Sequence, residues 1–120
     1  MDVLAEGLSD LGVLPRPPPR GAAAAAAVHP FCPHLLGHWL GMDVHDAGRV
    51  PQSRPLQPGV VITIEPGLYF GAGDARVPPH LRGIGVRIED DVVIVEGGAR
   101  VLSEGAPTAA EDVERAVLGG

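Results

Sequence analysis

The sequence predicts an α+β protein, a sheet with helices on one of its faces. Two apolar runs rich in Val and Ile, at residues 60–64 and 84–95, are typical of buried strands. Helix signals stand at both ends of the chain, as leucines at helical spacing in residues 2–14 and as a capping-box pattern that begins at Thr108. Strands enclosed between terminal helices favour a sheet that packs its helices on one face.

The composition indicates one folded domain with an aliphatic core. The chain has 120 residues, of which 45% are hydrophobic but only 3% aromatic, so Val, Ile, Leu and Ala must fill the core. The net charge is −6, lysine is absent and nine arginines are scattered, which leaves no basic stripe for nucleic acid. We therefore expect no nucleic-acid partner.

The sequence predicts neither a membrane span nor a secretory signal. No apolar run approaches the roughly 18 residues that a span needs. The N-terminus lacks a basic region followed by an apolar core, so we expect no targeting segment. Cys32 is the one cysteine and has no partner for an internal disulfide, which favours a reducing compartment.

The first thirty residues divide into a helix and a low-complexity segment. In residues 1–14, Leu4, Leu8 and Leu11 recur at helical spacing, and two glycines weaken the helix that they predict. Residues 15–30 combine a proline-rich stretch with six consecutive alanines, which is typical of a linker or insertion. The alanines are compatible with a local helix but offer no polar face to orient it, and we assign this segment no chemistry.

Three of the five histidines lie within residues 31–46: His34, His38 and His45. His34 and His38 are four residues apart, a spacing that aligns them on one face of a helix and also on one face of a strand. The glycines and alternating apolar residues around them favour a strand with a turn. His45 stands at an odd offset from His38, so it joins the others only if the strand bends or ends there.

The remainder of the chain predicts strands, loops and a last helix. The elements expected are a strand over 60–64, a loop over 71–83, one strand formed by 84–88 and 92–95, a short strand at 101–102 and a helix over 109–117. The first strand ends at Glu65-Pro66-Gly67, because proline and glycine do not continue a strand well. The last helix is preceded by Thr108, which has capping-box spacing to Glu111.

Two glutamates stand in strand-like apolar surroundings, Glu65 and Glu89. A carboxylate in such a setting is costly to bury unless it is paired or coordinates a cation. Neutral imidazole is a common metal ligand. The two glutamates and the histidine-rich stretch therefore predict a metal site. By the period of two along a strand, Arg87, Glu89 and Asp91 share one face.

Three motifs in a fixed order resemble those of one enzyme family. They are Pro-His-x-x-Gly-His-x-x-Gly-x-Asp-Val-His-Asp at residues 33–46, Ile-Thr-Ile-Glu-Pro-Gly at 62–67 and Gly-x-Arg-Ile-Glu-Asp-Asp at 85–91. Together they resemble the C-terminal part of the catalytic domain of the pita-bread metallopeptidases. Within that family they are most similar to Xaa-Pro aminopeptidase (aminopeptidase P), of which we suggest the mitochondrial type. Prolidase is the neighbouring alternative.

The resemblance implies a partial pita-bread fold, a curved and mostly antiparallel sheet with flanking helices, of which residues 31–120 form the C-terminal half. It also implies a centre of two divalent cations, usually Mn²⁺, about 3.5–4 Å apart. His38, Glu65 and Glu89 correspond to metal ligands of that centre. Glu89 corresponds to the carboxylate that bridges the cations, and Glu65 to the one that also takes a proton from the attacking water.

Three further residues acquire roles from the resemblance. His34 and His45 correspond to catalytic residues that line the substrate pocket and steady the peptide and the tetrahedral intermediate. Arg87, two residues before Glu89, is placed to hold a carboxylate behind the ligands. The implied activity is that of a metal-dependent aminopeptidase that releases the residue ahead of a proline. Its partner is a peptide, and the implied location is the mitochondrion or the cytoplasm.

The family's other two metal ligands are aspartates upstream of the histidine-rich stretch. In this sequence the upstream carboxylates Asp2, Glu6 and Asp10 lack a strand context. We therefore expect at most one bound cation and a catalytically incomplete chain. The alternative is a non-catalytic protein that uses the same fold for binding, as a partner of a full-length relative. An unpaired strand edge and an exposed apolar face are also expected, and both favour self-association.

Overall fold

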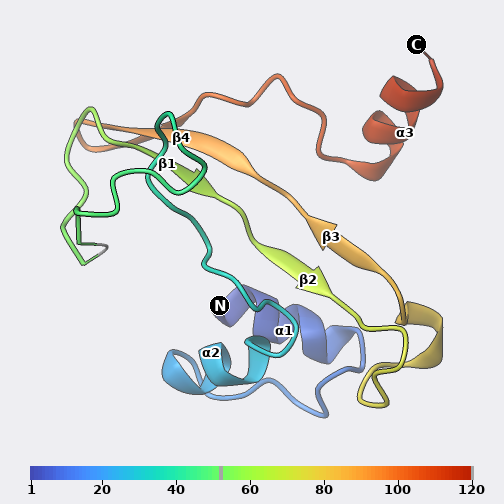
Figure 1. Cartoon of the computed structure of the whole chain (residues 1–120). Coiled ribbons are helices and arrows are strands. Elements are labelled where there is room, and N and C mark those ends of the chain that lie inside the picture. Colours follow the sequence, from blue (N-terminus) through green and yellow to red (C-terminus); the bar gives the residue numbers. More distant parts are fainter. Residues whose placement is uncertain (52, 120) are drawn as a thin grey trace. The chain divides into compact units, whose positions relative to one another are not determined.

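The computed structural model describes residues 1–51 and 53–119, which divide into two compact units (Figure 1). The first unit consists of Met1–Leu35 and Pro66–Arg87, and the second of Leu36–Glu65 and Ile88–Gly120. Both contain helices and antiparallel strands. The predicted α+β class is therefore confirmed.

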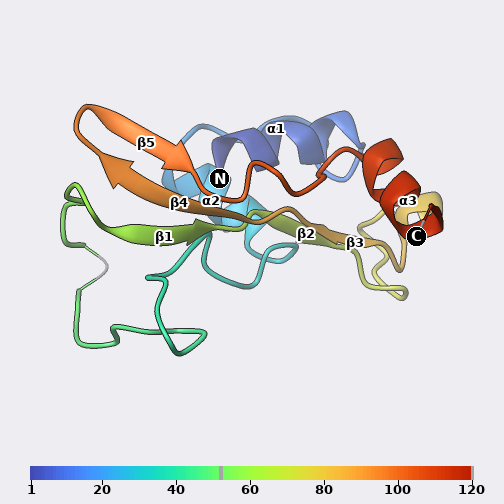
Figure 2. The same cartoon turned by 90° about the horizontal axis from the view of Figure 1, so that it is seen from above.

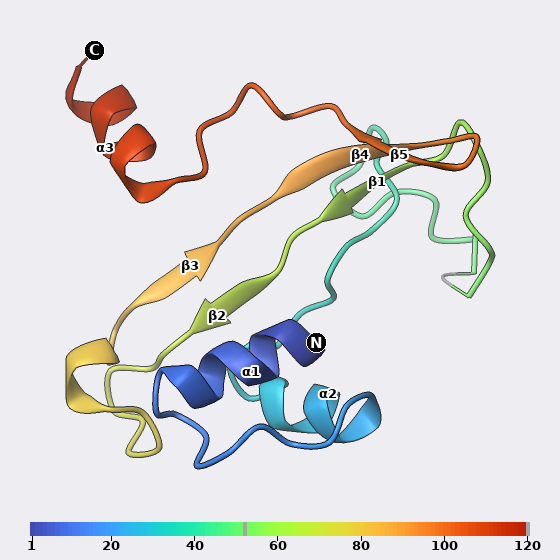
Figure 3. The same cartoon turned by 180° about the vertical axis from the view of Figure 1, so that it is seen from behind.

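The first unit is built on a pair of packed helices, α1 (Asp2–Asp10) and α2 (Ala22–Val28) (Figure 3). The inner face of α1 buries Ala5 and Leu8, and that of α2 buries Ala24 and Val28. The alanine run, which lacked a polar face to orient it, is thus oriented by contact with α1. Because alanine side chains are short, the alanine run lets α2 approach its neighbour closely.

The same unit contains a two-stranded ribbon of β2 (Gly67–Tyr69) and β3 (Gly85–Arg87), and the 3₁₀ turn η1 (Pro79–Leu81) lies in the loop that joins these two strands. The ring of Tyr69 lies across the two glycines of this ribbon. A Cβ atom at Gly67 would come within 2.8 Å of the Tyr69 hydroxyl, and one at Gly85 within 2.9 Å of the ring. The glycines therefore leave the space that the ring fills.

The second unit is organised around a three-stranded antiparallel sheet in the order β1-β4-β5 (Figure 2). Its strands are β1 (Val61–Ile64), β4 (Asp90–Val95) and β5 (Gly98–Val101). One cross-strand row consists of Trp39, Ile62, Val92 and Val101. Thr63 lies on the opposite face, because side chains alternate along a strand.

Residues 36–40 run along the outer edge of β1. The amide of Leu40 donates to the carbonyl of Val61 (3.1 Å), that of Thr63 to His38 (2.9 Å) and that of Glu65 to Leu36 (2.8 Å). The expected strand with a turn over the histidine-rich stretch is therefore only partly formed. Strand pairing there is limited to a bridge between Trp39 and Ile62, and the chain leaves the sheet after residue 40.

The prediction that residues 84–88 and 92–95 form one strand is wrong. β3 ends at Arg87 and pairs with β2, whereas β4 begins at Asp90 and pairs with β1. The segment that pairs with both strands contains Pro66 between β1 and β2, and proline has no amide to donate to a ladder. The break at Pro66 therefore also divides the segment opposite it into β3 and β4.

The last helix, α3 (Ala110–Leu118), begins and ends within one residue of its predicted limits. The expected capping box is not formed, because Ala109 occupies the N-cap position and no side chain caps the helix there. The acidic residues Glu111 and Asp112 lie in the first turn, where they favour the helix by interaction with its dipole.

Within the described ranges no helix combines the length and apolar character needed to span a bilayer.

The helix pair makes a testable contribution to stability through Leu8, whose side chain is completely buried. We expect Leu8→Ala to lower the free energy of unfolding by about 2–5 kcal/mol, because it removes buried methyl groups and leaves a cavity. Leu118→Ala is the control, since Leu118 is 83% exposed and its truncation should change stability by less than about 0.5 kcal/mol. Urea unfolding followed by circular dichroism measures both, and equal effects of the two substitutions would contradict the expectation.

Candidate metal centre

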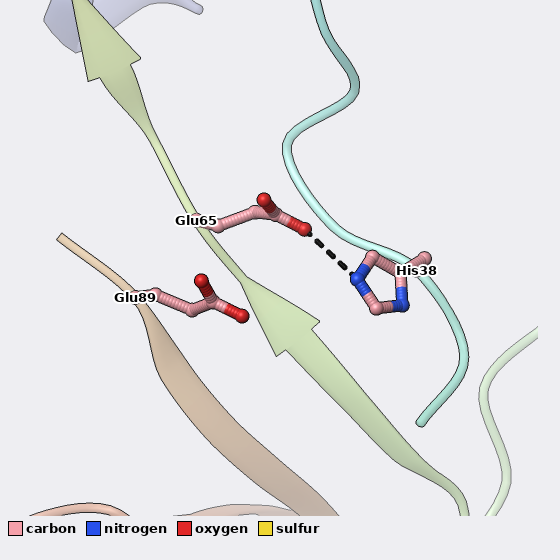
Figure 4. Close-up of side chains that lie close together, drawn as sticks. All are labelled: His38, Glu65 and Glu89. Carbon is pink, nitrogen blue, oxygen red and sulfur yellow. Dashed lines mark ion pairs between the residues drawn. The ribbon is translucent and has the colours of Figure 1, made fainter. Parts of the chain in front are cut away.

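Three side chains converge at the end of the β1–β4 ladder: His38, Glu65 and Glu89 (Figure 4). Each offers one ligand atom, and the three atoms all lie within 4.8 Å of one another. All three residues belong to the second unit. Among the described residues this is the group of His, Cys, Asp and Glu that could hold a cation with three ligands.

The strand register explains why the two glutamates meet. β1 and β4 pair Ile64 with Asp90, so the next position of the same register places Glu65 opposite Glu89. Opposite residues of an antiparallel pair project to the same face of a sheet. His38 reaches that face from the segment on the other side of β1, where its carbonyl accepts a hydrogen bond from Thr63.

Glu65 and His38 form the enclosed part of the group. Their side chains are 8% and 14% exposed, and Nε2 of His38 lies 3.2 Å from Oε1 of Glu65. Glu89 is exposed and closes the group on the solvent side. A buried carboxylate beside an imidazole, with a second carboxylate on the side open to solvent, is a suitable arrangement for a divalent cation.

The hydrogen bond of His38 Nδ1 favours a tautomer in which Nε2 faces Glu65 without a proton of its own. Nδ1 lies 3.1 Å from the carbonyl oxygen of Trp39, and because a carbonyl can only accept, Nδ1 carries a proton. In the neutral ring Nε2 then presents a lone pair to the Glu65 carboxylate, which also only accepts. A proton on Nε2 or a cation between the two groups resolves this opposition. The donor set therefore fits a metal ion.

Thr63 and Gly37 hold the histidine segment against β1. The hydroxyl of Thr63 accepts from the backbone amide of His38 (3.0 Å) and donates to Oε1 of Glu65 (3.0 Å). A Cβ atom at Gly37 would collide with the carbonyl oxygen of Thr63. Glycine at this position therefore permits the close approach that brings His38 to the site.

His45 lies beside His38, with ring centroids 4.9 Å apart and the rings at 89° to each other. Its loop is organised by Asp46, whose carboxylate accepts from the amides of Ala47 (2.6 Å) and Met42 (2.7 Å). These hydrogen bonds lower the pKa of Asp46 below its ordinary value. The loop also contains Gly41, where a Cβ atom would collide with the Asp46 carboxylate.

His34 and Arg87 belong to the first unit, and their contacts there centre on Tyr69. The His34 ring meets the Tyr69 ring edge-on with centroids 5.5 Å apart, and its Nδ1 donates to the carbonyl of Leu35 (2.7 Å). Nε of Arg87 donates to the Tyr69 hydroxyl (2.7 Å). The carboxylate-holding role expected of Arg87 stays a prediction, as do the substrate-binding roles of His34 and His45.

Two residues that contact these side chains, Thr63 and Tyr69, are not among the predicted site residues. Thr63 carries a recognisable signal, because it is a polar residue inside an apolar strand and stands two positions before Glu65, on the same face. Tyr69 has no comparable signal, since its position depends on a glycine that lies sixteen residues away in the chain and is brought opposite it by the β2–β3 register.

One histidine and two glutamates that could hold a cation, next to the ends of antiparallel strands in an α+β fold, resemble the centres found in metallohydrolases. The model of metallopeptidase family M24 matches residues 3–96 of the chain. The chain therefore belongs to this family.

Its relatives include Xaa-Pro aminopeptidases from mammals and bacteria. The chain is 44% identical over 115 residues to Xaa-Pro aminopeptidase 3 of Rattus norvegicus, covering 96% of this chain and 22% of that protein. It is 47% identical over 114 residues to Xaa-Pro aminopeptidase of Escherichia coli K12, covering 93% of this chain and 25% of that protein. The chain thus spans about a quarter of the length of these relatives.

Solved structures agree with the sequence comparison. Pseudomonas aeruginosa aminopeptidase PepP superimposes with a TM-score of 0.81 at 40% identity, over 98% of this chain and 27% of that one. A zinc-substituted Escherichia coli aminopeptidase P in complex with product gives a TM-score of 0.80 at 44% identity, over the same shares of the two chains. The prediction of a partial aminopeptidase P fold is confirmed.

The close approach at Gly37 provides a prediction. We expect Gly37→Ala to destabilise the protein by about 1–3 kcal/mol, because the added methyl group must push the His38 segment away from the Thr63 carbonyl. Gly48→Ala is the matched control, since a Cβ atom there meets nothing within 4 Å. Thermal unfolding measures both variants, and a melting temperature of Gly37→Ala equal to that of Gly48→Ala would contradict the expected clash.

The Asp46 loop provides a second prediction. A lowered pKa means that the ionised carboxylate stabilises the folded loop at pH values above its ordinary value of 3.8, and that this stabilisation is lost as the pH falls through the lower folded value. The amide proton shifts of Met42 and Ala47 should therefore titrate below pH 3.8. Asp46→Asn should abolish that titration, whereas Asp43→Asn should retain it. Amide shifts that do not respond to pH in the wild-type chain would refute the assignment.

Proposed function

We propose that this chain contributes the His38, Glu65 and Glu89 ligands to the metal centre of an aminopeptidase that removes an N-terminal residue ahead of proline. The observation that carries the proposal is the convergence of these three side chains in a member of metallopeptidase family M24. The relatives named as Xaa-Pro aminopeptidases support a specificity for peptides with proline in the second position. An Escherichia coli aminopeptidase P solved with the inhibitor Pro-Leu supports a peptide as the substrate.

The chain's own residues have distinct tasks in this proposal. When bound, a divalent cation supplies Lewis acidity toward a peptide carbonyl and lowers the pKa of water. Glu65, enclosed beside His38, holds the cation and accepts the proton that the attacking water releases. His45 is exposed beside His38, so it is accessible to a substrate and donates a hydrogen bond to the tetrahedral intermediate.

We propose Mn²⁺ as the cation and one cation per chain. Oxygen and imidazole ligands suit Mn²⁺, and three ligand groups within 4.8 Å suffice for one ion. We also propose that His34 contacts the substrate and that Arg87 holds a carboxylate. We further propose a mitochondrial or cytoplasmic location, supported by a relative from Arabidopsis thaliana named as a mitochondrial intermediate cleaving peptidase.

A second candidate is a protein that binds a cation or a partner without catalysis. The observation that favours it is the size of the ligand set, because the described residues bring together three ligands, whereas the paired-cation centre requires more. Under this alternative the chain binds Mn²⁺ but does not hydrolyse peptides.

The metal centre is tested by calorimetric titration of the chain with Mn²⁺. We expect one ion per chain, and we expect Glu89→Ala to weaken binding by more than the 10–100-fold that removal of a group behind a ligand causes. Glu96→Ala is the matched control, since Glu96 is an exposed glutamate in the turn between β4 and β5. Equal affinities of Glu89→Ala and Glu96→Ala would refute the assignment of Glu89.

The same samples decide between catalysis and binding. We expect a tripeptide with proline in the second position to remain uncut by the Mn²⁺-loaded chain, because three ligands are fewer than a paired-cation centre requires. Release of its first residue at the rate of a complete enzyme would show that they suffice.

A further inference from the structure

Thr63 is the buried residue that connects two of the three predicted cation ligands. Its side chain is enclosed, with the residue only 2% exposed. The hydroxyl oxygen lies 3.0 Å from the backbone nitrogen of His38 and 3.0 Å from Oε1 of Glu65. Because an amide can only donate, the hydroxyl accepts from His38 and its own proton points to the carboxylate. The hydroxyl therefore links the two residues through one accepted and one donated hydrogen bond.

We propose that Thr63 is a positioning residue of the cation site. The proposal rests on the proposed function, since it assigns the site's geometry to a residue that does not itself touch the ion. Rotation of the Glu65 carboxylate about its last bond breaks the hydrogen bond from Thr63 and is therefore resisted. Movement of His38 away from β1 breaks the hydrogen bond from its amide, so the same oxygen restrains both ligands.

The chemistry of threonine suits this position better than that of its nearest relatives. Threonine is branched at Cβ, which restricts χ1 and suits a strand interior. Serine has the hydroxyl without this restriction, and valine has the shape without the hydroxyl. In valine, the His38 amide loses its buried acceptor, and the desolvation of an unpaired amide is not compensated. The pair of substitutions therefore separates hydrogen bonding from packing.

The first experiment is calorimetric titration with Mn²⁺ of the full chain and three variants. We expect Thr63→Val to weaken Mn²⁺ binding about 10–100-fold, the usual effect of removing a group that orients a ligand. Thr63→Ser should retain most of the affinity, because it keeps the hydroxyl. Thr108→Val is the matched control, since it makes the same chemical change at the exposed threonine before α3.

The second experiment does not depend on a metal. Amide hydrogen exchange of His38, measured by NMR in the metal-free chain, should be faster in Thr63→Val and near the wild-type rate in Thr63→Ser. Thermal unfolding establishes beforehand that each variant is folded. If Thr63→Val does not fold, Thr63→Ala and Thr63→Ser provide the same comparison.

The outcomes separate this proposal from the proposed function. Wild-type Mn²⁺ affinity and wild-type exchange of His38 in a folded Thr63→Val variant would overturn the role of Thr63 while leaving the metal site intact. If the wild-type chain binds no Mn²⁺, the proposed function fails, and the exchange of His38 alone decides whether Thr63 positions these side chains. Loss of affinity in Thr63→Val together with retention in Thr63→Ser supports the proposal.

Discussion

Burial of the Glu65 carboxylate is the constraint on which the candidate centre depends. A carboxylate with 8% of its side chain exposed is costly unless charge and hydrogen bonds compensate for its lost hydration. The chain supplies a hydroxyl from Thr63 and an imidazole from His38, both within 3.2 Å of one carboxylate oxygen. The arrangement of the surrounding backbone can be understood as the means of bringing these groups to Glu65.

Two features of the backbone meet this requirement. Pro66 interrupts the pairing directly after Glu65, so that the chain on the opposite side is also released from its ladder and can present Glu89. On the other edge of β1, Gly37 lets the histidine segment approach the carbonyl of Thr63. The candidate site therefore lies where the β1–β4 pairing ends on one side of β1 and where the histidine segment packs against β1 at Gly37 on the other side.

This arrangement of the backbone explains which parts of the fold and of the candidate site could be predicted from the sequence. Glu65 and Glu89 are recognisable because charged residues are rare in apolar strands, and the limits of β1 and α3 follow from local patterns. The division between β3 and β4 could not be predicted from residues 84–95 alone, because it depends on Pro66 in the segment that pairs with them. The role of Thr63 depends on a contact with His38, twenty-five residues away, and the packing of α2 depends on α1. Local periodicity contains none of these contacts.

Glu65 and Glu89 lie opposite each other by the register of β1 and β4. Two ionised carboxylates at opposite positions of an antiparallel pair repel each other and destabilise the pairing. The ligand atoms of these two carboxylates and of His38 all lie within 4.8 Å of one another. A divalent cation held by these residues would reduce this repulsion and would also accept the lone pair of a neutral imidazole. A cation bound at this group would therefore stabilise the β1–β4 pairing, and the pairing would in turn favour binding of the cation.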